Sequence, residues 1–166
     1  MKWLTRAVAI LILAALAIWL WRVFFPSPET VIHNRLVKLA EDASFSQNDG
    51  LLSKAAGARA VPDFFAPRVD IVLDLPGQVR HTFNDRQDIA DKALASRTGS
   101  GLSVKFPDIN VSVNPGGATA VADVTLNARI PGDRDDIVEE LQITLEKTNG
   151  DWLINRVQTV RPVSLP

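Results

Sequence analysis

The feature that most constrains this chain is an apolar run near its N-terminus. From Ala7 to Trp21 the sequence reads AVAILILAALAIWLW, with no polar side chain. As a helix this run spans roughly 22 Å, and extension through Phe25 brings it to roughly 28 Å, close to a hydrocarbon thickness of about 30 Å. The run predicts a membrane anchor over residues 1–25 and one folded domain over residues 26–166.

A cleaved signal peptide is the competing interpretation of the same run. Lys2 and Arg6 form a basic head, and Ala15-Leu16-Ala17 has the form of a cleavage site. Cleavage there would leave a short apolar core and expose Ile18–Trp21 on the mature chain, so the anchor is favoured. The basic head favours a cytoplasmic N-terminus, a single pass through the inner (cell) membrane, and a periplasmic or extracytoplasmic domain.

Composition excludes several classes of site. The formal net charge of −1 disfavours nucleic acid, because phosphate binding needs clustered Lys and Arg. There is no cysteine and there are only two histidines, His33 and His81, so no metal site is expected. Tyrosine is also absent, which removes one common acid and oxyanion donor. We expect no cofactor, because the Gly-rich turns lack the sequence context of a phosphate loop.

Local signals predict three helices before and within the sheet. Ser27 is a favourable N-cap and Pro28 suits the first helical position, so the first helix begins there and buries Ile32, Leu36, Leu39, Ala40 and Ala43. A short second helix holds Leu51, Leu52, Ala55 and Ala56, and a further turn covers Val61–Phe65. Asn84 and Gln87 form an N-x-x-Q capping box, which predicts a third helix to about Arg97 with Ile89, Ala90, Ala93 and Leu94 inside.

Strand signals dominate the rest of the chain. Residues 69–75 and 78–83 flank Pro76-Gly77 and predict a first hairpin. Four longer strands then form a meander, near 102–113, 118–129, 136–148 and 151–163. The fold class is therefore α+β, with an antiparallel sheet packed on the N-terminal helices.

The Asn149-Gly150 turn fixes the register of the last hairpin, because Asn-Gly favours a two-residue loop. It pairs Thr148 with Asp151, Leu145 with Ile154, and Ile143 with Arg156. One face of the sheet is then apolar and carries Ala120, Ala122, Val124, Leu141, Ile143, Leu145, Trp152 and Ile154. The other face is polar, with Arg129 opposite Asp136 as a cross-strand pair.

Three segments occur in a characteristic order: FFAPRVD at 64–70, NDRQDI at 84–89 and NGDWLI at 149–154. They resemble the nuclear-transport-factor-2-like (NTF2-like) superfamily, which includes the SnoaL-like and ketosteroid-isomerase-like proteins, although Asp85 replaces a glycine. The resemblance covers about 29–163. It implies a cone-shaped curved sheet wrapped on helices, with a pocket between them, and it implies no single activity.

The first hairpin carries the candidate catalytic residues, Asp74 and His81. An even-length loop at Pro76-Gly77 pairs Val72 with His81 and places Asp70, Asp74 and His81 on one face. An imidazole beside carboxylates can act as an acid/base pair. Asp74 also lies in VLDLPG, which resembles the segment bearing the general base of ketosteroid-isomerase-like enzymes. A three-residue loop would instead separate this cluster, leaving no catalytic site.

Arg156, Gln158 and Asp70 are the candidate binding residues. The predicted register places Arg156 and Gln158 on the apolar face, where Arg156 could hold an anionic ligand. The alternative is that Arg156 pairs with a helix carboxylate or reaches solvent at the sheet edge, because an unpaired buried charge is costly.

The leading functional hypothesis is a membrane-tethered, non-catalytic binding or protein-interaction module. Its expected partners are lipid through the anchor, a membrane protein, or a small hydrophobic or anionic ligand. The alternative is a small-molecule lyase, isomerase or hydrolase that uses Asp74 and His81. A third hypothesis is an accessory subunit that docks through the anchor and first helix. A hollow cone holding Asp74 and His81 would favour an enzyme, whereas a filled cone would favour an interaction role.

Overall fold

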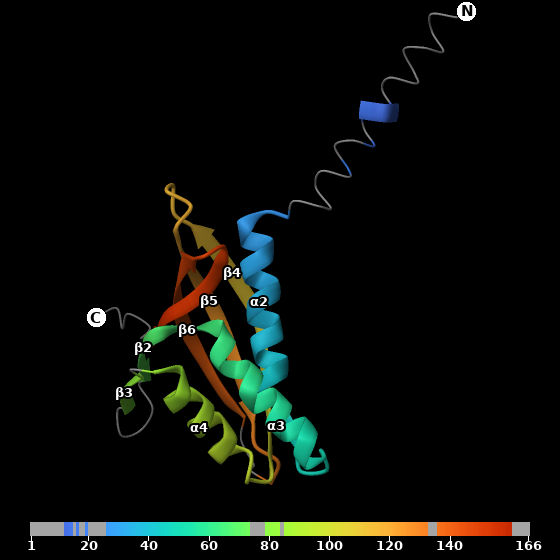
Figure 1. The fold of residues 1–166 in the computed structure, drawn as a ribbon, viewed down its shortest axis with the longest axis vertical. Coiled ribbons are helices and arrows are strands. Elements are labelled where there is room, and N and C mark those ends of the chain that lie inside the picture. Colours follow the sequence, from blue (N-terminus) through green and yellow to red (C-terminus); the bar gives the residue numbers. More distant parts are fainter. Residues whose placement is uncertain are drawn as a thin grey trace, which may run out of the picture.

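The computed structural model describes residues 12–14, 16, 19, 26–73, 79–83, 85–132 and 136–160 (Figure 1). Its helices are α2 (Pro28–Ala43), α3 (Leu51–Ala60), the 3-10 turn η1 (Val61–Phe64) and α4 (Arg86–Ser96). Its strands are β1 (Phe45–Ser46), β2 (Phe65–Leu73), β3 (Val79–Phe83), β4 (Gly101–Val113), β5 (Thr119–Arg129), β6 (Ile137–Thr148) and β7 (Asp151–Thr159).

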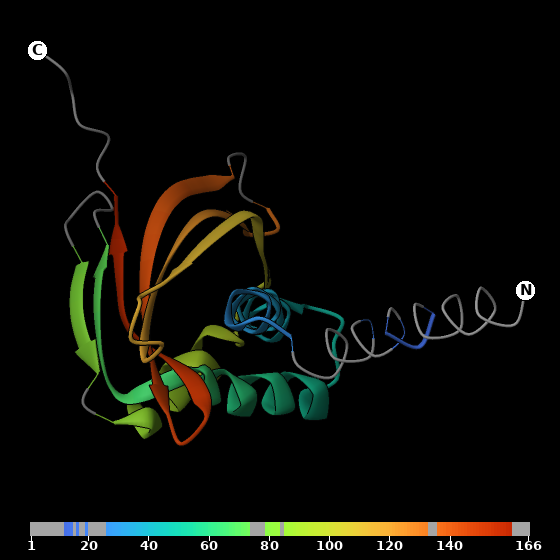
Figure 2. The same ribbon diagram turned by 90° about the horizontal axis from the view of Figure 1, so that it is seen from above.

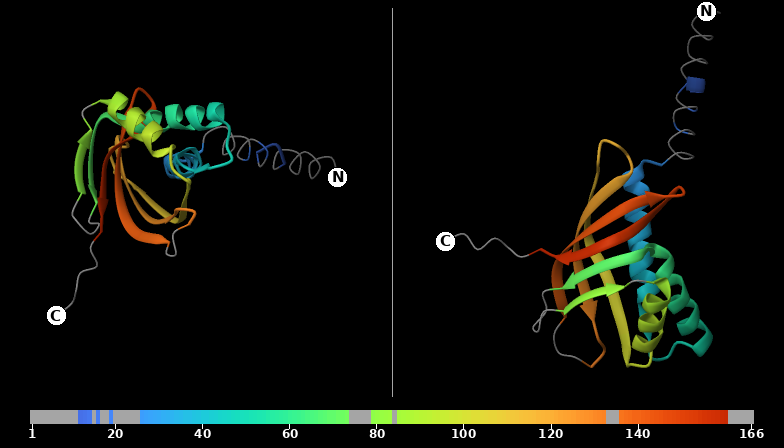
Figure 3. Two further views of the ribbon diagram at one scale, coloured as in Figure 1. Left: turned by 90° about the horizontal axis from the view of Figure 1, so that it is seen from below. Right: turned by 60° about the vertical axis from the view of Figure 1, so that its left-hand side comes forward.

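The strands form one curved sheet around helix α2, in the order β1-β4-β5-β6-β7-β2-β3. Figure 2 shows the strands curling around α2, with α3 and α4 to one side of it. Figure 3 shows β2 and β3 continuing the sheet beyond β7. The structure confirms the α+β class and the curved sheet. The sheet is mostly antiparallel, as predicted, but β2 joins β7 as a parallel neighbour.

The predicted register of the meander is confirmed through most of its length. Ala120, Ala122 and Val124 lie opposite Leu145, Ile143 and Leu141, and Thr148 lies opposite Asp151. Asn149 and Gly150 both have positive φ, at 53° and 94°, which is the backbone form that an Asn-Gly hairpin turn adopts. Side chains alternate along a strand, so this register buries one face of the sheet along the middle of β5 and β6.

Helix α2 covers that inner face of the sheet. Ser27 caps it by accepting a hydrogen bond from the Thr30 amide at 3.3 Å, and Pro28 occupies the first turn, as predicted. Its apolar side chains enter one core with those of η1, α4 and the inner face. The buried members include Ile32, Leu36, Leu39, Phe64, Phe65, Val69, Ile89, Leu145, Trp152 and Ile154. The cone is therefore held together by an apolar filling that comes from its own chain.

A buried arginine joins the three helices at the other end of α2. The Arg97 side chain is only 6% exposed, donates from Nη2 to the Asp42 carbonyl, and lies over the Phe45 ring at 5.2 Å. Gly57 leaves the space for it, since a Cβ there would lie 2.8 Å from Arg97 Nη1. Burial lowers the pKa of Arg97, while Asp42 and Asp49 act in the opposite direction. The Asp42 carbonyl lies in the last turn of α2, where cations are favoured.

The helices differ from the sequence-based expectations in two details. The cap of α4 is Asp85, whose side chain accepts from the Gln87 amide, so the helix begins one residue later than the Asn84 box implies. Leu94 is 53% exposed and does not belong to the inner face. Leu51 and Leu52 lie in α3 as expected, but both are exposed to solvent.

Most of the predicted anchor, residues 7–25, lies outside the described residues. Among the residues that the structure does describe, no helix is both long and apolar enough to span a bilayer.

Candidate functional site

The register of the first hairpin differs by one residue from the predicted one. Ile71 lies opposite His81, Asp70 opposite Thr82 and Val69 opposite Phe83. The last paired residues are Leu73 and Val79, and five positions, 74–78, separate them. The connection therefore has an odd number of residues, whereas an even number was expected. By this register Asp70 and His81 belong to opposite faces of the hairpin, so the prediction that they share a face is wrong. Asp74 lies outside the described residues, and its catalytic role with His81 stays a prediction.

A β-bulge in β7 changes the position of Arg156. Leu145 lies opposite Ile154 as predicted, but the register shifts there, and Ile143 lies opposite Val157 instead of Arg156. Asn155 is the extra residue. Val157 is buried and Arg156 is exposed on the outer face, so the prediction that Arg156 shares the apolar face is wrong. The bulge keeps the guanidinium in water and avoids an unpaired buried charge.

Gln158 moves to the outer face with Arg156. It lies opposite Gln142 and donates to the Gln142 side chain at 2.9 Å, and Gln142 in turn donates to Asp123 at 3.1 Å. The predicted Arg129–Asp136 pair is also present on this face, with an Nη2–Oδ2 distance of 2.9 Å. That hydrogen bond raises the pKa of Arg129. Hydrogen bonds between polar side chains thus cross β5, β6 and β7 on the outer face.

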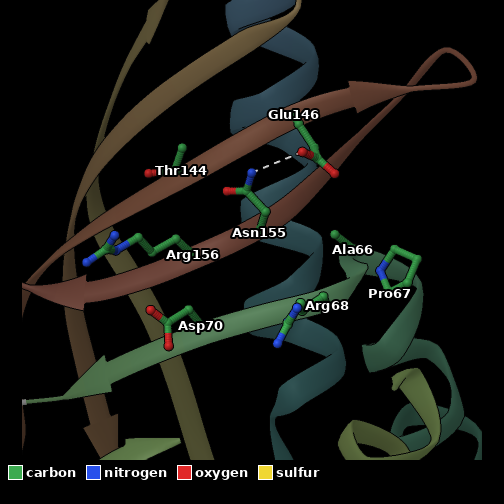
Figure 4. A pocket seen from close by; sticks show the side chains of 8 residues that line it. All are labelled: Ala66, Pro67, Arg68, Asp70, Thr144, Glu146, Asn155 and Arg156. Carbon is green, nitrogen blue, oxygen red and sulfur yellow. Dashed lines mark hydrogen bonds between the residues drawn. The ribbon is translucent and has the colours of Figure 1, made fainter. Parts of the chain in front are cut away.

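The bulge and the parallel β2–β7 pairing create a groove on this outer face. Asp70 of β2 lies directly opposite Arg156 of β7 in the ladder. Figure 4 shows both side chains in the groove, with Arg68 two positions before Asp70 in β2. We call this hollow of about 970 Å³ the outer groove; its lining consists of Ala66, Pro67, Arg68, Asp70, Thr144, Glu146, Asn155 and Arg156.

The outer groove is charged, and its two arginines form no ion pair with any other described residue. Arg68 and Arg156 are both exposed, and no carboxylate of the described residues lies within 4.0 Å of either guanidinium. Glu146 accepts a hydrogen bond from Asn155 at 3.1 Å, which holds the bulge residue against β6. Exposed charges next to an open hollow suit reversible recognition of a polar or acidic partner.

Sequence reasoning reached two members of this groove, Asp70 and Arg156, and missed the others. Arg68 lies in the FFAPRVD segment but was not predicted to bind a ligand, and Thr144, Glu146 and Asn155 lie in no motif. The proximity of these residues depends on the bulge and on the parallel pairing of β2 with β7. Among the described residues, no three His, Asp or Glu side chains gather as a metal site.

Two further hollows lie among the described residues. Besides the outer groove, one hollow of about 560 Å³ lies beside the β6–β7 turn, and one of about 200 Å³ lies over β4 and β5 near Lys105 and Arg129. None of these three hollows is lined by an inner-face side chain of β4, β5 or β6.

Comparison with known proteins defines the fold class. No family model and no curated protein matches the sequence. An NTF2-like protein of unknown function from Pseudomonas putida covers 81% of this chain and 86% of its own, with 10% identity and a TM-score of 0.58. An NTF2-like protein with a cystatin-like fold from Novosphingobium aromaticivorans covers 93% and 90%, with 14% identity and a TM-score of 0.55. A candidate scytalone dehydratase from the same species covers 82% and 93%, with 14% identity and a TM-score of 0.56.

These likenesses, at such low sequence identity, show the fold alone. The chain has the NTF2-like, or cystatin-like, fold, as the resemblance of its three segments implies. Proteins of this fold include ones of unknown function and a candidate enzyme, so the fold does not select an activity.

The bulge can be tested by comparing two neighbouring positions in β7. Val157→Ala should lower the free energy of unfolding by about 2 kcal/mol, because it removes two methyl groups from a packed core. Arg156→Ala should change it by less than about 0.5 kcal/mol, because the side chain is exposed. Chemical denaturation of the full-length chain in detergent measures both. A larger loss for Arg156→Ala than for Val157→Ala would mean that β7 has the unbulged register.

Proposed function

We propose that this protein is a membrane-tethered, non-catalytic binding module that holds its partner in the outer groove. The packing of apolar side chains inside the described part of the cone is the observation that supports a binding role over catalysis. Phe64, Phe65 and Trp152 occupy the space between the helices and the inner face, together with Leu36 and Leu145. A substrate pocket of the enzyme kind needs that space to be empty.

The two arginines of the outer groove favour a partner with acidic groups. Arg68 and Arg156 lie on neighbouring strands, are exposed, and have no carboxylate within ion-pair distance in the described part of the chain. Asp70 and Glu146 lie beside them, so the partner must match alternating charges, which favours a protein surface over a simple anion. Such complementarity gives specificity and a fast association rate.

The sequence supports the tether. The fifteen apolar residues from Ala7 to Trp21 lead almost directly into Ser27, the N-cap of α2. A tether so close to the domain would place the N-terminal end of α2 beside the headgroups. It would leave the outer groove, on the opposite face of the sheet from α2, open to a partner at the same membrane.

The tether predicts the mass of the mature chain. Protein extracted from membranes should retain residues 7–25, because the run has a weak cleavage site and the length of a span. Intact-mass measurement after detergent extraction tests this. A mature N-terminus at Ile18, with the protein in the soluble fraction, would contradict the tether.

Site-specific photocrosslinking in the source cells tests the outer groove. A photoreactive residue at position 68 or 156 should capture one discrete partner, the same from both positions. The matched control is position 110, which is also exposed on the outer face but lies on β4, away from the groove. Capture of the same partner from all three positions, or from position 110 alone, would contradict a role for the groove. The absence of any adduct from positions 68 and 156 would contradict it equally.

A further inference from the structure

A second hollow adjoins the outer groove and contains two arginines. It lies where α2, η1 and the β6–β7 turn meet, and it shares Pro67 with the groove. Arg35 of α2 and Arg86 of α4 line it, together with Asp63, Thr148, Asn149 and Asp151. Its volume is about 560 Å³, which is ample for a small ligand.

Neutral groups hold both guanidinium groups in place. Arg35 donates from Nη2 to the Asp63 carbonyl and lies over the Phe64 ring at 5.1 Å. Arg86 donates from Nε to the Phe65 carbonyl at 3.1 Å. The two carbonyls flank Phe64, at the junction of η1 and β2. One short segment of backbone therefore orients two positive charges toward the same hollow.

Within the described part of the chain, neither arginine forms an ion pair. Among the described residues, no carboxylate lies within 4.0 Å of Arg35 or Arg86. The Nε atom of Arg35 is also buried and has no hydrogen-bond partner among the described residues. Two arginines ordered in advance lose little conformational entropy when an anion binds, and their planar forks match phosphate oxygens.

We propose that this hollow binds one phosphate group between Arg35 and Arg86. Thr148 and Asn149 line the same hollow, and a hydroxyl and an amide are groups that can donate to the remaining oxygens. Asp63 and Asp151, both exposed on its rim, disfavour a polyanion and so limit the ligand to a single phosphate. This site does not depend on a partner in the outer groove.

The phosphate can come from solution or from a lipid. Arg35 is seven residues into α2, about 10 Å along the helix axis from Pro28. If residues 7–25 anchor the chain, the hollow lies close to the headgroup layer, which adds several Å to each side of the hydrocarbon core. A lipid phosphate and a soluble phosphate ester would make the same contacts with both arginines.

Calorimetric titration of the full-length chain in non-ionic detergent with inorganic phosphate tests the site, with chloride at equal ionic strength as the reference. Phosphate should bind saturably and chloride should not. Arg86→Gln should weaken phosphate binding by about tenfold or more, because a charge-assisted contact is lost. Arg86→Lys keeps the charge but loses the fork, and it should fall between the wild type and Arg86→Gln.

Two control variants locate the bound anion. Arg59→Gln removes an exposed arginine of α3 that does not line the hollow, and Arg68→Gln removes one from the outer groove only. Both should leave phosphate affinity unchanged. The site is overturned if phosphate does not bind saturably, or if Arg86→Gln has no effect. It is also overturned if Arg68→Gln weakens binding as much as Arg86→Gln does.

Reconstitution identifies the source of the phosphate. The protein is titrated with inorganic phosphate in vesicles of phosphatidylcholine alone and in vesicles that also contain phosphatidic acid. Loss of phosphate binding in the second membrane would support the site with a lipid headgroup as its occupant. Equal binding in both membranes would support the site with a soluble occupant.

Discussion

The packing of α2 against one apolar face of the sheet is the interaction on which the rest of the structure depends. Ile32 and Leu36 of the helix, and Leu145 and Ile154 of the sheet, are all buried in one core. Only a curved sheet can surround a helix in this way. The curvature brings β2 back to β7 and leaves polar side chains such as Asp123, Gln142 and Gln158 on the outside. The position of both charged hollows follows from that arrangement.

Much of this fold could be predicted because its signals are local. Asn149-Gly150 fixes one hairpin, and strict alternation in β5 and β6 then assigns Ala122, Val124 and Ile143 to the core. Ser27 and Pro28 likewise mark the beginning of α2. In each case residues that are close in sequence determine the structure, so a pattern is sufficient to predict it.

The candidate site could be predicted only in part, because it depends on distant pairings. Asp70 and Arg156 are 86 positions apart in the sequence and become neighbours through a parallel strand pairing that no sequence motif predicts. Arg156 reaches the outer face only because Asn155 bulges. One extra residue in a strand turns the side chains that follow it to the opposite face. The odd connection between β2 and β3 separates Asp70 from His81 for the same reason.

Apolar side chains of the described residues pack the inside of the cone, and we propose that ligands bind outside it. Methyl NMR of the full-length chain in detergent under xenon pressure tests this directly, since xenon enters empty apolar cavities. No saturable shift is expected for the methyl groups of Leu36, Ile143 and Leu145. Saturable shifts at these three residues would reveal an empty apolar cavity in the cone and would contradict this packing.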